Sequence, residues 1–72
     1  MEQGFRIKSV PVHMSRILLF GRLRELTGKS ISEMQALVEV GGVFRIRQDL
    51  EGPLVKMLLD NLELHGVRIV RL

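Results

Sequence analysis

Cysteine, tryptophan and tyrosine are absent from this 72-residue sequence. Without cysteine, neither a disulfide nor a thiolate metal site can supplement the core, so stability must come from apolar burial or from self-association. The aromatic residues are limited to Phe5, Phe20 and Phe44, and we therefore expect a mainly aliphatic core. The apolar fraction of 46% is sufficient for such a core and exceeds that of disordered chains.

Long apolar runs are also absent. No run approaches the roughly 18 residues that a membrane-spanning helix requires. The N-terminal segment Met1–Lys8 has no apolar signal core. We therefore expect a cytoplasmic location with no membrane partner, and the length predicts a single domain over residues 1–72.

Alternation of apolar and polar residues predicts three strands. In the first, Gly4–Pro11, Phe5, Ile7 and Ser9 are expected on one side of the strand. Pro11 removes a backbone donor, so the strand should end there or lie at an edge. The other two strands are expected over Val43–Gln48 and Val67–Leu72.

The first helix is predicted over Arg16–Thr27. Ser15 is a good N-cap, and Gly28 supplies the C-terminal stop. At the helical period, one apolar stripe should face the core. That stripe is Leu19, Leu23 and Leu26, with Leu18 beside it, and the opposite face is Ile17, Phe20, Gly21 and Arg24.

Two further helices follow. Ser30 and Glu33 fit a capping box at the start of the second, which Gly41-Gly42 ends. The third opens at Gly52-Pro53 and ends at Gly66. The expected buried stripes are Ile31, Met34, Leu37 and Val38 in the second helix and Leu54, Val55, Leu58 and Leu62 in the third. The sequence thus predicts an α+β domain of β-α-α-β-α-β order, with three helices on one face of a three-stranded sheet.

These elements carry a family pattern. An arginine precedes a Thr-Gly pair, and a short capped helix ending in Leu-Val-Glu follows; here these are Arg24, Thr27-Gly28 and Leu37-Val38-Glu39. In this respect the stretch from about Phe5 to Leu72 resembles the C-terminal domain of the bacterial ribosomal stalk protein, which recruits translational GTPases. The resemblance implies the same element order and a protein-docking role for the first helix and the start of the second.

The resemblance also assigns positions within that docking face. The family's apolar contact positions fall on Ile17 and Phe20, and its helix arginine falls on Arg24. Its lysines fall on Gly21 and Gln35, so these basic contacts are missing. We do not expect the dimerisation domain and hinge of the stalk protein either, because the matching region starts at the first predicted strand. The resemblance therefore implies a stand-alone relative and not a tethered stalk.

The Clp protease adaptor that recognises N-terminal degrons shares this fold. Its Asn-Asp-Asp turn after the first strand is replaced here by Val10–Met14, so degron recognition is not expected.

The outward face of the first helix leaves several interpretations open. This face carries Ile17 and Phe20 beside Arg24, with Arg16 at the margin. In the first interpretation these residues form an exposed docking patch. In the others, the two apolar side chains are buried in the domain or contact a second copy of the chain. Gly21 costs up to about 1 kcal/mol in mid-helix relative to alanine. It either allows another backbone to approach closely or is a tolerated surface glycine.

A homodimer is a further expectation, because a domain this small has apolar residues beyond its predicted core stripes. These residues are Ile17, Phe20, Met57 and Leu59.

A basic sheet face is the alternative site. The net charge of +3, from 11 Lys+Arg against 8 Asp+Glu, is itself compatible with ordinary solubility. The predicted strands nevertheless place Arg6, Lys8, Arg45, Arg47 and Arg68 on their non-core side. This face either binds nucleic acid or an acidic ligand, or is a solvated face that protects the sheet edge. Because the strand phenylalanines point to the core, a base-stacking platform is not expected.

No motif indicates catalysis or a metal centre. His13 and His65 lack a second ligand at metal-binding spacing. The carboxylates are scattered, over Glu25, Glu33, Glu39, Asp49, Glu51, Asp60 and Glu63. We expect no cofactor, no metal and no enzymatic activity. The principal hypothesis is a module that binds a protein through its first helix.

Overall fold

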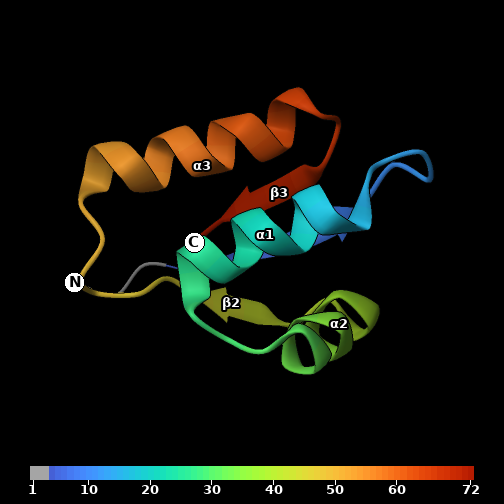
Figure 1. The fold of residues 1–72 in the computed structure, drawn as a ribbon, viewed down its shortest axis with the longest axis horizontal. Helices are drawn as coiled ribbons and strands as arrows, with labels where there is room; N and C mark the ends of the chain where they lie inside the picture. Colours follow the sequence, from blue (N-terminus) through green and yellow to red (C-terminus); the bar gives the residue numbers. More distant parts are fainter. Residues whose placement is uncertain (1–3) are drawn as a thin grey trace.

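The structure, a computed structural model, describes residues 4–72, so the first three residues of Met1–Lys8 lie outside the described chain. The elements follow the predicted order (Figure 1): β1 (Gly4–Ser9), α1 (Arg16–Thr27), α2 (Ile31–Val40), β2 (Val43–Arg45), α3 (Gly52–Leu64) and β3 (Arg68–Arg71). The predicted α+β fold, with three helices and a three-stranded sheet, is confirmed.

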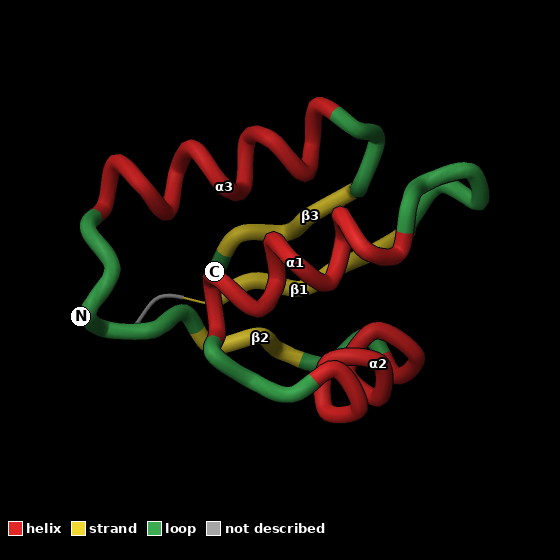
Figure 2. The backbone as a smooth tube through the Cα atoms, viewed as in Figure 1, coloured by secondary structure: helices red, strands yellow, loops and turns green. Residues whose placement is uncertain are grey.

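The strands form one antiparallel sheet in the order β2-β1-β3, which makes β1 central. Helices α1 and α3 lie across one face of this sheet, and α2 packs beside α1 near the β2 side (Figure 1, Figure 2). No helix of residues 4–72 covers the other face, which we call the open sheet face.

Strand β1 ends at Ser9, before the predicted end at Pro11. Its pairing with β3 shifts between Ile7 and Ser9, which leaves Lys8 as an extra residue. Such a bulge changes the sides to which later side chains point. As a result Val10 packs against the core, where simple alternation predicted Ser9.

Strand β2 is shorter than predicted because the chain leaves the sheet after Arg45. The backbone N–H of Arg47 donates to the carbonyl of Leu26 in α1 at 2.8 Å. Within the sheet, Phe5 lies opposite Phe44 and their rings stack, with centroids 5.1 Å apart and planes 7° from parallel. Both rings are fully buried, as predicted.

Helix α1 is buried around more of its circumference than the sequence predicted. Phe20 is only 6% exposed, so its assignment to an exposed face is wrong. Helix α2 flanks the side of α1 that carries Phe20. On the other side, Nε of Arg22 donates to Oδ1 of Asn61 in α3 at 3.1 Å. With a helix on each side, the solvent-exposed part of α1 is reduced to the face that carries Ile17, Gly21 and Arg24 and to its flanking charged residues.

The buried stripes of α2 and α3 also differ from expectation. Ile31 is 51% exposed, whereas Met34 is the fully buried residue of α2. In α3, Leu59 is buried and Leu54 is partly exposed, so the helix is rotated toward the Leu59 side. Short amphipathic helices have approximate stripes, and the neighbouring element decides which flank is covered.

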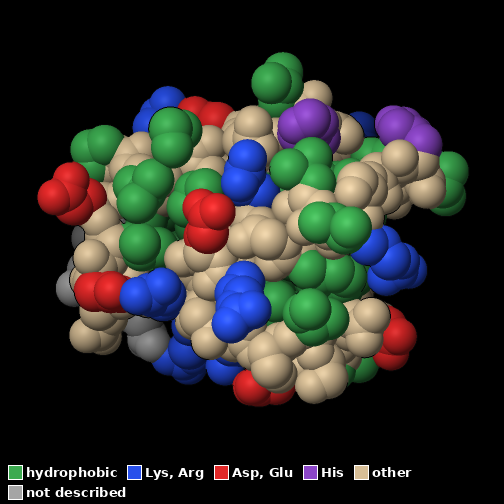
Figure 3. Space-filling model, in the orientation of Figure 1, with side chains coloured by type: hydrophobic (Ala, Val, Ile, Leu, Met, Phe, Trp, Pro, Cys, Tyr) green, Lys and Arg blue, Asp and Glu red, His purple; other side chains and the backbone are tan. Residues whose placement is uncertain are grey.

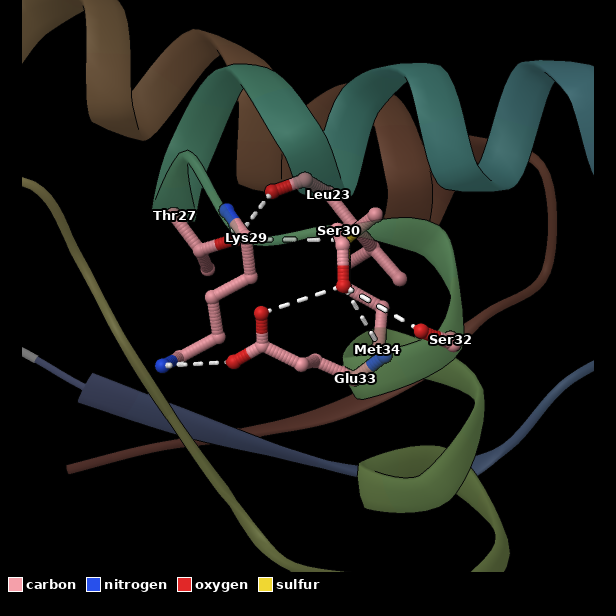
Figure 4. A network of polar contacts seen from close by, with 7 residues as sticks. All are labelled: Leu23, Thr27, Lys29, Ser30, Ser32, Glu33 and Met34. Carbon is pink, nitrogen blue, oxygen red and sulfur yellow. Dashed lines mark hydrogen bonds and ion pairs between the residues drawn. The ribbon is translucent and has the colours of Figure 1, made fainter.

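A polar network holds the turn between α1 and α2 (Figure 4). Oγ of Ser30 accepts from the backbone N–H of Glu33 at 3.3 Å, and the carboxylate of Glu33 accepts in return from the backbone N–H of Ser30, which confirms the predicted capping box. Oγ of Ser30 also donates to Oε1 of Glu33 at 3.0 Å. These bonds from Ser30, together with the nearby Lys29, hold the pKa of Glu33 below its ordinary value. On the α1 side, the hydroxyl of Thr27 donates to the carbonyl of Leu23 at 2.8 Å. The network orients α2 against α1.

Candidate partner-binding surfaces

A shallow groove of about 380 Å³ runs between α1 and α2; we call it the α1–α2 groove. Every residue that the sequence predicted for partner binding on α1 lines it, together with two residues of α2. The lining is Arg16, Ile17, Phe20, Gly21 and Arg24 from α1 and Ile31 and Gln35 from α2. Hydrophobic side chains gather between the two helices in Figure 3, with Lys and Arg side chains near the margins.

The groove is lined mainly by apolar atoms. Ile17, in the first turn of α1, is 89% exposed, and Ile31 lies exposed on the facing helix. Phe20 lies between them as the buried floor. Apolar surface of this kind gains about 25 cal/mol for each Å² that a partner covers, and exposed apolar patches with polar margins mark interaction sites.

Two arginines lie along the groove, Arg16 and Arg24. Within residues 4–72 neither forms an ion pair or a side-chain hydrogen bond, although Arg22 on the same helix pairs with Glu25 at 3.4 Å. The groove therefore presents an apolar floor beside cations that are available to acidic groups of a partner.

Gly21 lies at the groove in mid-helix. A Cβ built on it meets no atom within 4 Å, so packing within this chain does not require glycine there. Its small size allows another backbone to come close to α1.

A second depression of about 540 Å³ adjoins the groove and shares Arg16, Phe20 and Gln35 with it. Its other wall is the loop between β1 and α1, where Val12 is fully exposed. This loop was not predicted as part of a site. The signal for it in the sequence is Val10-Pro11-Val12, an apolar run that continues beyond the end of β1 at Ser9.

The predicted basic sheet face is present in part. Arg6, Lys8, Arg45 and Arg68 are exposed on the three strands or immediately beside the shift in β1.

The placement of Arg47 on that face is wrong. Its side chain lies against Gly28 at the end of α1, and its guanidinium donates to both carboxylate oxygens of Asp49, at 3.0 and 2.6 Å. This contact holds the pKa of Asp49 below its ordinary value. Because β2 ends early, Arg47 follows the turn and not the sheet.

The histidines and carboxylates do not converge on one site. Within residues 4–72, no group of three or more His, Asp or Glu side chains is arranged to hold a metal ion. His13 lies in the loop before α1, and His65 is the C-cap of α3. On the outer side of α3, Arg71 bonds to both Asp60 and Glu63, and the hydrogen bond from Arg71 is the main cause that lowers the pKa of Asp60.

No protein-family model, curated protein or solved structure matched this chain. The helices of residues 4–72 are too short or too polar to cross a bilayer.

Proposed function

We propose that this chain is a cytoplasmic, non-enzymatic binding module that docks a protein partner in the α1–α2 groove. The observation that carries the proposal is Ile17, a β-branched aliphatic side chain that is almost fully exposed at the margin of an apolar depression. The sequence also resembles the stalk-protein domain, in which the same helix docks protein factors. This resemblance supports the same face of α1 as the docking site.

The groove favours a partner that presents an apolar side chain next to acidic ones. The apolar side chain packs over Phe20, between Ile17 and Ile31, where it is removed from water. Carboxylates beside it pair with Arg16 and Arg24. Interfaces of this kind place an apolar anchor at the centre and charged groups at the rim, and the charges mainly raise the association rate.

Affinity capture from the native cell with matched variants tests the proposal. Ile17→Asp places a charge in the groove, and we expect it to abolish capture of the partner. Met57→Asp is the control, because Met57 is also well exposed but lies on α3. Retention of the same partner by Ile17→Asp, or its equal loss in both variants, would overturn the proposal.

The acidic variant should not unfold the domain. Ile17 lies in the first turn of α1, which has no acidic residue. A carboxylate there interacts favourably with the helix dipole, by about 0.3–1 kcal/mol. Loss of capture by a folded Ile17→Asp variant can therefore be assigned to the groove, and circular dichroism checks the fold.

A further inference from the structure

The apolar surface between α1 and α2 continues past the α1–α2 groove toward the loop before α1. The second depression, of about 540 Å³, shares Arg16, Phe20 and Gln35 with the groove, so the two are continuous, and we call them together the extended groove. Ile31 lines only the α1–α2 groove, and Val38 lines only the second depression. These two residues lie seven positions apart on α2, which corresponds to about 10.5 Å along the helix axis.

The loop between β1 and α1 forms the far wall of the extended groove and projects at the same end of the molecule as α2 (Figure 1). The backbone N–H of Met14 donates to the carbonyl of Pro11 at 3.1 Å, which closes a turn with Val12 at its tip. Val12 is fully exposed, although glycine, asparagine, aspartate and serine are the residues that turns favour. The folded chain gains no burial from a valine at this position, whereas an apolar group bound in the second depression would cover it.

Side-chain charge changes sign along the extended groove. Arg24 lines the end where α2 begins, Arg16 lies where the two depressions meet, and Glu39 lines the end where α2 finishes. All three side chains are exposed. A complementary occupant carries acidic groups at the Arg24 end and a basic group at the Glu39 end. The pattern therefore specifies the direction of the occupant as well as its charge.

The walls of the extended groove favour a helical occupant. None of the residues that line it belongs to a strand, and most belong to α1 and α2, whose backbone groups are bonded within each helix. An extended peptide in such a groove would bury backbone groups without partners, which costs free energy, whereas a helix satisfies its own. Gly21 leaves open space beside α1, where the backbone of a second helix can come close.

We infer that the partner presents an amphipathic α-helix that lies along the extended groove, parallel to α2. This inference rests on the proposed function, because the α1–α2 groove is one half of the surface. Two apolar side chains seven positions apart on the partner helix pack beside Ile31 and Val38. Acidic side chains near its N-terminus face Arg24 and Arg16, and a basic side chain near its C-terminus faces Glu39. The same order of charges is favourable for the dipole of the partner helix.

Selection of random peptides of about 16 residues, displayed on phage, against the immobilised domain tests the inference without a known partner; a helix of that length spans about 24 Å. We expect the enriched peptides to carry apolar residues at positions i and i+7, acids in the first half and Lys or Arg near the end. Circular dichroism of synthetic copies should show helix gained on binding. Enriched peptides that bind without gaining helix, or an absence of enriched peptides, would overturn the inference.

A matched pair of valine variants tests the second depression. Val12→Asp changes its wall, whereas Val40→Asp makes the same change at an exposed valine that lines neither depression. Anisotropy with a labelled enriched peptide should show about tenfold or weaker binding for Val12→Asp, because burial of the valine is lost, and no more than about a twofold change for Val40→Asp. Aspartate suits a turn, so Val12→Asp should remain folded. Equal affinities of the two variants would contradict occupation of the second depression.

A charge exchange at Glu39 tests the direction of the bound helix. Glu39→Lys should weaken binding of the enriched peptide by about 2–5-fold, and replacing the C-terminal Lys or Arg of the peptide by Glu should restore the affinity. Unchanged or tighter binding of the original peptide to Glu39→Lys would show that the helix does not lie parallel to α2.

Ile17→Asp separates this inference from the proposed function. Weaker peptide binding by Ile17→Asp and by Val12→Asp supports both. If only Ile17→Asp weakens binding, the α1–α2 groove remains the docking site and the extended groove is wrong. If the enriched peptides bind Ile17→Asp as tightly as the unaltered domain, the proposed function itself is wrong.

Discussion

At the scale of single residues, Ile17 and Phe20 show that helical periodicity alone does not predict which side chains are buried. The two are neighbours on one side of α1, and the sequence placed both on the face opposite the core stripe, with exposure and burial both left open. One is almost fully exposed and the other is core. Phe20 belongs to the core cluster and forms the floor between α1, α2 and the loop before α1, whereas Ile17 stays at the margin of the groove. The apolar spacing of a single helix contains no information on where its neighbour lies.

This difference predicts different costs for truncating the two side chains. Phe20→Ala should destabilise the domain by about 3–5 kcal/mol, because it leaves a cavity beneath the groove. Ile17→Ala should change the free energy of unfolding by no more than about 0.5 kcal/mol, as exposed positions do. Urea unfolding measures both. Similar losses for the two variants would show that Ile17 is packed against the domain.

Glycine substitutions separate the roles of Gly21 and Gly28. Gly21→Ala should stabilise the domain by about 0.5–1 kcal/mol, because it lies in mid-helix with open space around it. Gly28→Ala should cost about 1–2 kcal/mol, since its φ of 72° is left-handed. Thermal unfolding compares them. A stabilised Gly21→Ala variant that binds the partner more weakly would show that the partner packs closely on α1.

At the scale of elements, helix ends were predictable from the sequence and strand ends were not. Ser15 accepts from the backbone N–H of Leu18, and Gly28 adopts a left-handed conformation, as their types predicted. These signals act within a few residues of one another. The end of β2, in contrast, depends on the bond from Arg47 to Leu26, and the bulge at Lys8 depends on pairing with β3. Such contacts join distant parts of the chain.

Three carboxylates with lowered pKa values predict a loss of folding stability in acid. The pKa values of Glu33, Asp49 and Asp60 are lowered in the folded domain by contacts with Ser30, Arg47 and Arg71 respectively. A lowered folded pKa contributes stability that is present above the unfolded value, near 4, and is lost as the pH falls through the folded value. The urea concentration at the unfolding midpoint should therefore decrease as the pH is lowered below about 4. This decrease should be smaller in Glu33→Gln. An equal acid dependence in Glu33→Gln would exclude the capping box as a contributor.

At the scale of the whole molecule, the α1–α2 groove and the exposed strand cations Arg6, Lys8, Arg45 and Arg68 lie on separate parts of the surface. The sequence predicted most residues of both surfaces. Cations on the polar side of a strand, and apolar residues outside the core stripe of a helix, can be identified from the apolar–polar pattern alone. It did not predict that Ile31 would border the groove or that the strand cations would align diagonally. These features depend on helix packing and strand register, which arise only when the elements assemble.

The homodimer remains a prediction, and fewer exposed apolar residues now support it. Of the residues that suggested it, Phe20 and Leu59 are core, and Ile17 and Met57 remain exposed. If a second copy covers the groove, the weight-average mass in sedimentation should rise with concentration and return to the monomer value in Ile17→Asp. A constant monomer mass across concentrations would contradict self-association.

The most direct test of the central claim is a nuclear magnetic resonance titration of the ¹⁵N-labelled domain with the captured partner. Binding in the groove should shift the amides of Arg16–Arg24 and of the first turns of α2. Amides of β3 and of the outer side of α3 should stay in place. A response centred on the sheet or on α3, with α1 unaffected, would contradict the assignment of the α1–α2 groove as the docking site.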